Sequence, residues 1–146
     1  MVMNMKSSKD LLSSALKTTQ MGQIGIRSIM KCNIHPQLRN ALQSQLHEYD
    51  TIEQEAKDIA TARNWKVKEL DPSIKAMTDM MTRTRLTFGN TNSKAAAMMI
   101  QGNTRGVIKG LKNLHHYDGS DKAIAGLTRR LITCEQENIQ QMQGFV

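Results

Sequence analysis

Apolar side chains recur at steps of three and four residues in four long stretches of the chain, which is the spacing of one face of an α-helix. These stretches predict helices over residues of about 8–31, 36–63, 93–116 and 120–143. Leu, Ile, Ala and Met fill most of the apolar positions, and only 3% of the residues are aromatic. Because strands favour β-branched and aromatic residues, this composition predicts an all-α protein.

The breaks between these stretches predict how the helices are connected. Pro36 opens the second helix after a short break, so the first two helices should form an antiparallel hairpin. Ser120 can cap the last helix after a short polar turn. Residues 64–92 form a long crossover that should contain a short extra helix, with methionines that fill the core beneath it or adapt to a partner. With 146 residues, the chain 1–146 is expected to be one domain, a four-helix bundle.

Each predicted helix has one mainly apolar stripe. Three of these stripes are Leu12, Leu16, Thr19, Gln23, Ile26 and Met30; Leu38, Leu42, Gln45, Tyr49, Ile52, Ala56 and Ile59; and Ile124, Leu127 or Thr128, Leu131, Glu135, Asn138 and Met142. The stripe of the 93–116 helix is predicted to be Ala97, Gln101, Thr104, Ile108, Leu111 and His115. All four stripes become polar near their midpoints, which meet in an antiparallel bundle.

These polar positions predict one buried layer at mid-height. Its members are Gln20, Gln23, Gln45, Glu48, Tyr49, Gln101, Thr104, Glu135 and Asn138. A buried polar group costs about 1–3 kcal/mol when it has no partner, so the layer must be satisfied from within, by water or by a ligand. One interpretation is a self-satisfied hydrogen-bond layer that fixes helix register; the other is a di-metal centre, which carboxylate bundles hold at the same height.

The chemistry of the layer favours the first interpretation. A di-iron centre uses about four carboxylates and two imidazoles. The layer has one securely placed carboxylate, Glu135, and the four histidines of the chain lie elsewhere. We therefore expect no metal, neither di-iron nor di-manganese, and no other cofactor.

The basic residues predict one candidate surface, and the spacing of the glycines predicts another. The net charge is +7, and a candidate anion-binding patch consists of Arg105, Lys109, Lys112, Arg129 and Arg130. A solvated face is the alternative, and without interleaved aromatic residues we do not expect nucleic-acid binding. Gly102, Gly106 and Gly110 recur at steps of four and predict a groove along the 93–116 helix.

Cysteine usage and hydropathy limit the class of protein. Cys32 and Cys134 are too few for a disulfide framework and lack metal-ligand spacing, so reduced thiols are expected. No stretch has the length and apolarity of a secretory signal or a membrane span, which predicts a cytoplasmic protein. No nucleophile and base are recognisable from spacing, so we do not expect an enzyme.

Three segments carry a resemblance to known proteins: QMGQIGIRSI at residues 20–29, SKAAAMMIQGNT at residues 93–104 and CEQENI at residues 134–139. With them, the chain resembles an uncharacterised bacterial ferritin-like family over nearly its whole length. The resemblance implies two antiparallel hairpins joined by a crossover and a vestigial, ligand-poor di-metal site. It implies no activity, because these motifs are packing motifs.

Together, the sequence predicts a non-catalytic ferritin-like helical bundle with a structural or protein-interaction role. The expected partner is another protein or a second copy of the chain. The alternatives are a degenerate metal-binding protein of the same type and a basic bundle that binds polyanions.

Overall fold

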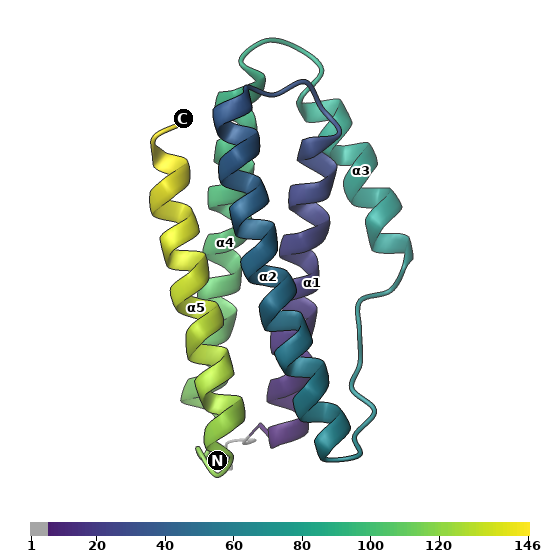
Figure 1. The fold of residues 1–146 in the computed structure, drawn as a ribbon, viewed down its shortest axis with the longest axis vertical. Helices are drawn as coiled ribbons and strands as arrows, with labels where there is room; N and C mark the ends of the chain where they lie inside the picture. Colours follow the sequence, from purple (N-terminus) through teal and green to yellow (C-terminus); the bar gives the residue numbers. More distant parts are fainter. Residues whose placement is uncertain (1–5) are drawn as a thin grey trace, which may run out of the picture.

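A computed structural model describes residues 6–146, which form five helices and no strand (Figure 1). They are α1 (Ser8–Met30), α2 (Pro36–Ala62), α3 (Ser73–Arg85), α4 (Thr91–His115) and α5 (Lys122–Gln143). The four helices predicted from the sequence are therefore confirmed, as is a short helix within the crossover. α4 begins two residues before the predicted position. None of the described helices is long and apolar enough to cross a bilayer.

Side-chain caps set several helix ends. The Ser7 hydroxyl accepts a hydrogen bond from the backbone N–H of Asp10 at 3.1 Å, and Pro36 occupies the first turn of α2. The cap of α5 is Asp121, whose carboxylate accepts from two backbone N–H groups, and not the predicted Ser120. Asp121 also binds Arg63 at the end of α2, so this cap ties two helices together.

The helices form a bundle in which α1 packs with α2 and α4 packs with α5 (Figure 1). The segment between α2 and α4 runs back along the bundle, and its helix α3 lies on the outer side of α1. Asp79 holds α3 there, because its carboxylate accepts from Lys31 at 2.7 Å and from the Ser28 hydroxyl. Contrary to the core-filling prediction, Met77, Met80 and Met81 are 57%, 70% and 48% exposed.

The core consists mainly of Leu, Ile and Ala from α1, α2, α4 and α5. The predicted stripes of α1, α2 and α5 are confirmed, except that Met30 and Ile59 are only partly buried. Leu12, Leu42 and Ile124 have no exposed surface. Burial of such side chains is the main stabilising contribution to the fold.

The predicted stripe of α4 is wrong. Ile108 and Leu111 are 47% and 52% exposed, and Gln101, Thr104 and His115 are exposed as well. The residues that α4 buries are Ala95, Ala96, Met99, Asn103, Gly106 and Asn113. Most of these are small, which allows the α4 backbone to approach its neighbours closely. Close approach is therefore the feature that α4 shows on its buried face, whereas Ile108 and Leu111 face outward.

Candidate functional site

A buried polar cluster lies at mid-height of the bundle, and it consists of Tyr49 from α2, Asn103 from α4 and Glu135 from α5. Tyr49 Oη lies 2.7 Å from Asn103 Oδ1 and 3.3 Å from Glu135 Oε2. All three side chains are at least 97% buried, with exposures of 0%, 2% and 3%. We call this set the mid-bundle cluster.

The order of donors in the mid-bundle cluster follows from its geometry. The Asn103 amide nitrogen donates to the Met99 carbonyl at 2.8 Å, so the Asn103 oxygen faces Tyr49 and can only accept. Tyr49 has one hydroxyl hydrogen and donates it to this oxygen, which is the closer of its two neighbours. Its remaining contact, with Glu135 Oε2, is then satisfied when the Glu135 carboxyl group is protonated and donates.

Burial favours the protonated form of this acid. Desolvation raises the pKa of Glu135 to about 8. Desolvation, with the nearby Glu135 as a second cause, also raises the pKa of Tyr49 well above its ordinary value. Glu135 Oε1 is buried and has no hydrogen-bond partner. The cluster thus presents one unsatisfied acceptor.

Two glycines make room for the mid-bundle cluster. A Cβ at Gly22 would lie 2.5 Å from Cζ of Tyr49, and a Cβ at Gly106 would lie 2.6 Å from the carboxyl carbon of Glu135. Both distances are shorter than the closest approach that Cβ atoms show to other heavy atoms in proteins. The Tyr49 ring therefore packs directly on the α1 backbone, and the Glu135 carboxyl group packs directly on the α4 backbone.

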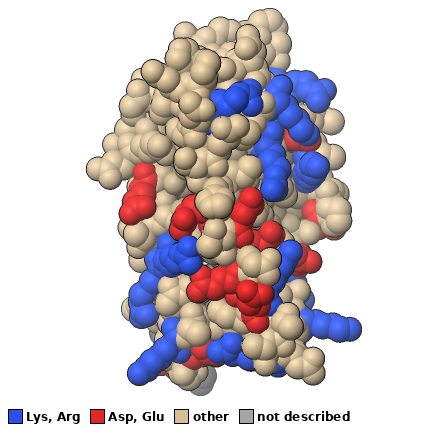
Figure 2. Space-filling view, viewed as in Figure 1, with Lys and Arg blue, Asp and Glu red and all other residues tan. Residues whose placement is uncertain are grey.

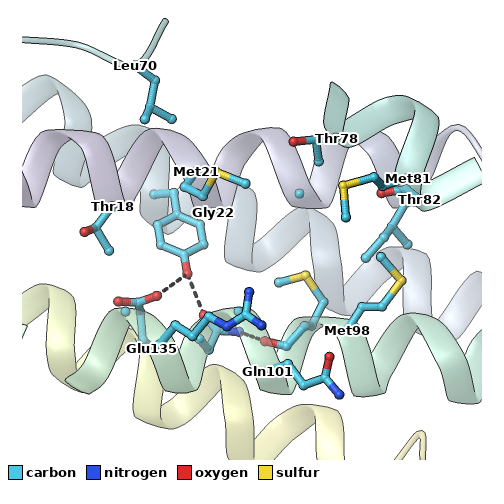
Figure 3. Close-up of a pocket in the computed structure, with 18 of the residues that line it drawn as sticks. Thr18, Met21, Gly22, Leu70, Thr78, Met81, Thr82, Met98, Gln101 and Glu135 are labelled. Atoms are coloured by element: carbon cyan, nitrogen blue, oxygen red, sulfur yellow. Dashed lines mark hydrogen bonds between the residues drawn. The ribbon is translucent and has the colours of Figure 1, made fainter. Parts of the chain in front are cut away.

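A pocket of about 440 Å³ opens beside the cluster, between α1 and α4 and under α3 (Figure 3). Tyr49, Asn103 and Glu135 lie on its wall. Figure 3 shows Thr18 and Glu135 toward one end and Thr78, Met81 and Met98 toward the other. This volume is in the range of small-molecule sites, which are typically apolar with a few polar groups. The groove predicted from the glycine spacing is confirmed at Gly102 and Gly106, which both line the pocket.

The other predicted layer residues do not meet in one layer. Gln23 is buried but donates to Asp50 of α2 at 2.8 Å, and Gln45 is buried and donates to Gln141 of α5 at 2.7 Å. Asn138 is buried, and its amide lies 3.8 Å from the Cys134 sulfur. Gln23, Gln45 and Asn138 are therefore buried as predicted, but Gln23 and Gln45 bind side chains of neighbouring helices outside the mid-bundle cluster.

Four members of the predicted layer lie outside the core, which corrects the prediction. Gln101 and Thr104 are exposed because α4 turns its opposite side inward. Glu48 is partly exposed and binds Arg130 at 3.1 Å. Gln20 is half-buried and donates to Glu69 in the crossover at 2.8 Å.

Sequence reasoning missed Asn103, which supplies the α4 contribution to the mid-bundle cluster. The available signal was the glycine spacing: Asn103 lies between Gly102 and Gly106, on the side of α4 that can approach other backbones. Apolar periodicity instead favoured the side with Ile108 and Leu111.

The donor set of the mid-bundle cluster does not fit a di-metal centre. It has one carboxyl group, which burial favours in the neutral form, a phenol and an amide. Within residues 6–146, no three His, Cys, Asp or Glu side chains are grouped so that they could hold a metal ion. The absence of a bound metal in solution stays a prediction.

The candidate anion patch is divided in the structure. Arg130 binds Glu48 and Glu55, so its charge is already matched. On the face drawn in Figure 2, acidic side chains gather over the middle, where α2 passes. Arg105 and Lys109 line the pocket, whereas Lys112 and Arg129 are exposed and do not. The part of the patch that adjoins a cavity is therefore Arg105 and Lys109.

The two cysteines are free. Cys134 is buried, and desolvation together with the nearby carboxylates of Glu48 and Glu135 raises the pKa of its thiol to about 12. A thiol with such a pKa is almost wholly protonated at neutral pH and is a poor nucleophile.

Comparison with known proteins identifies a structural neighbour but no family. No protein-family model matches the chain, and no curated protein matches it. Among solved structures, the crystal structure of a DUF305 fragment from Deinococcus radiodurans is similar, with a TM-score of 0.73 and 11% sequence identity. The match covers 96% of this chain and 95% of that chain. At this identity the likeness concerns the fold alone, and it supports an all-helical bundle.

Proposed function

We propose that the protein is a non-catalytic bundle of the ferritin-like type that binds a small, mostly apolar molecule between α1, α3 and α4. The observation that carries this proposal is the pocket of about 440 Å³ beside the mid-bundle cluster. Bundles commonly hold their ligands between facing helices. Two hairpins joined by a crossover support the ferritin-like assignment.

The walls of the pocket suit a flexible apolar ligand. Met21, Met81, Met98 and Met99 line it together with Ile29. Methionine side chains adapt to irregular shapes, so such a wall accepts related molecules of differing outline. The absence of a cysteine nucleophile is supported by the raised pKa of the buried Cys134 thiol.

A pocket-filling variant tests the proposal. Gly102 lines the pocket, and a Cβ there would meet nothing within 4 Å, so Gly102→Leu should fold and occupy part of the cavity. Gly126 on α5 is the matched control, since a Cβ there also meets nothing within 4 Å and the residue does not line the pocket. The probe is N-phenyl-1-naphthylamine, a neutral dye whose fluorescence rises in apolar surroundings.

We expect the wild-type protein and Gly126→Leu to bind the dye equally, and Gly102→Leu to bind it about tenfold more weakly, a loss of about 1.4 kcal/mol. Circular dichroism should show that all three are folded. No dye binding by the wild type, or equal binding by the two variants, would refute a ligand site between α1 and α4.

A further inference from the structure

The two ends of the pocket differ in chemistry. At one end, Glu135 packs on Gly106 of α4, and Arg105 and Lys109 lie on the pocket side of the same helix. By helix geometry, Lys109 lies about 4.5 Å farther along the axis than Gly106. Lys17 of α1 also lines the pocket and is next to Thr18, which Figure 3 places near Glu135. This end therefore combines an acid with three basic side chains.

None of these three basic side chains has a carboxylate within ion-pair distance in the described part of the chain. Glu135 is the one acidic residue among those that line the pocket. Burial holds it neutral at pH 7 because its pKa is raised to about 8, so it does not offset the basic charge. The potential at this end is therefore positive, and it favours an anion over a cation.

The polar end also has an unfilled hydrogen-bond position. The Tyr49 hydrogen is directed to Asn103, and the Asn103 amide donates to Met99, so neither can serve Glu135 Oε1. This oxygen is buried without a partner, on a side chain that is 97% buried and lines the pocket. A buried acceptor without a donor is costly, and a ligand that supplies the donor removes that cost.

The other end of the pocket is less polar, with methionines between Thr78 and Thr82, and Arg85 of α3 is the one basic lining residue outside the polar end. Met81 of α3 and Met98 of α4 lie there, away from Glu135 (Figure 3). α3 covers this end and is held to α1 through Asp79. An alkyl or aromatic tail directed toward α3 would be removed from water by these side chains, with a gain of about 25 cal/mol per Å² of apolar surface buried.

We propose that the pocket binds an amphipathic organic anion whose head group carries both a negative charge and a hydrogen-bond donor. The charge lies among Lys17, Arg105 and Lys109, the donor meets Glu135 Oε1, and the apolar tail extends under α3. A hydroxy fatty acid and a monoalkyl phosphate share this chemistry. The inference rests on the proposed function, because it concerns the same pocket.

A series of ligands with one tail tests the head-group chemistry. The probes are 3-hydroxydecanoate, decanoate, decanol and decylamine, each used to displace N-phenyl-1-naphthylamine. We expect 3-hydroxydecanoate to bind most tightly, about tenfold better than decanoate, which lacks the hydroxyl donor, and better than decanol, which lacks the charge. Decylamine should bind most weakly. Decyl phosphate should match or exceed decanoate.

The double variant Arg105→Gln/Lys109→Gln tests the charge, with Lys112→Gln as the matched control on the same helix. The double variant should lose about tenfold in affinity for 3-hydroxydecanoate and keep its affinity for decanol, while the control keeps both. Equal displacement by all probes, tighter binding of decylamine, or an unchanged double variant would overturn the head-group inference while dye binding still supports the pocket. Failure of the dye itself to bind would instead refute the proposed function.

Discussion

Replacing Glu135 with Gln should change how the stability of the protein depends on pH. Glu135 has a pKa of about 8 in the folded state, against 4.5 for an ordinary glutamate. Between these two values the unfolded chain releases the proton and the folded chain keeps it. The unfolded state then binds fewer protons, so the free energy of unfolding falls as pH rises from about 4.5 to about 8. The contribution is complete below the lower value and lost above the higher one.

The size of this effect follows from the shift. Each pKa unit corresponds to about 1.4 kcal/mol, so the wild type should lose about 3 to 4 kcal/mol relative to Glu135→Gln between about pH 5 and pH 8. The Gln amide can donate to Tyr49 as the protonated acid does, and its second N–H has no partner, at a cost of about 1–3 kcal/mol. The variant should therefore be less stable near pH 5 and comparable or more stable near pH 8.

Urea denaturation at a series of pH values measures this difference directly. Groups other than Glu135 titrate in both proteins, so their contributions cancel when the two free energies of unfolding are subtracted. A difference that stays constant within about 1 kcal/mol from pH 5 to pH 8 would refute the buried, neutral acid. Glu135→Leu is the harsher control, because it removes the group that contacts Tyr49.

Further changes test other parts of the structure. Gly106→Ala places a Cβ against the Glu135 carboxyl group and should cost about 1–3 kcal/mol, whereas Gly102→Ala, in open space on the same helix, should stabilise by about 0.5–1 kcal/mol; urea titration compares the two. Asp79→Asn should loosen α3, seen as faster amide hydrogen exchange there; because Lys31 and Ser28 lower the pKa of Asp79, the wild-type attachment should persist above the ordinary carboxyl pKa and weaken as pH falls through the lowered value. If a second copy is the predicted partner, Leu111→Glu on the exposed side of α4 should abolish any dimer detected by sedimentation; an unchanged dimer would place the interface elsewhere.

The helices could be predicted from the sequence because their signals are local. The stripe of α5, from Ile124 to Met142, is apolar at both ends and is buried as predicted, including Glu135 and Asn138 near its middle. Pro36 and the polar turn before α5 set helix ends through backbone chemistry that depends on a few neighbouring residues. Such features need no knowledge of the partner helix.

The site could not be predicted in the same way, because α4 does not bury the apolar residues of its predicted stripe, Ile108 and Leu111. Its inward face has Asn103 and Gly106, which carry no hydrophobic signal, whereas Ile108 and Leu111 lie outside. What selects this face is the space that Gly106 leaves for Glu135, a contact between helices that periodicity within one helix does not report. The prediction of one polar layer failed for this reason at Gln101 and Thr104, and the cavity beside Asn103 depends on the same choice of face.

A titratable acid at position 135 is an unfavourable choice if the mid-bundle cluster serves packing alone. At pH 7, keeping Glu135 protonated costs about 3 kcal/mol relative to an ordinary glutamate, and the isosteric Gln would avoid that term. Proteins give up stability at sites where function needs a destabilised group. Lys17, Arg105 and Lys109 line the same pocket as the acid, and the proposed anion would hold Glu135 neutral and donate to its free oxygen. Anion binding and the protonation of Glu135 should therefore favour each other. Such coupling would explain an acid at position 135, which the packing of the bundle does not.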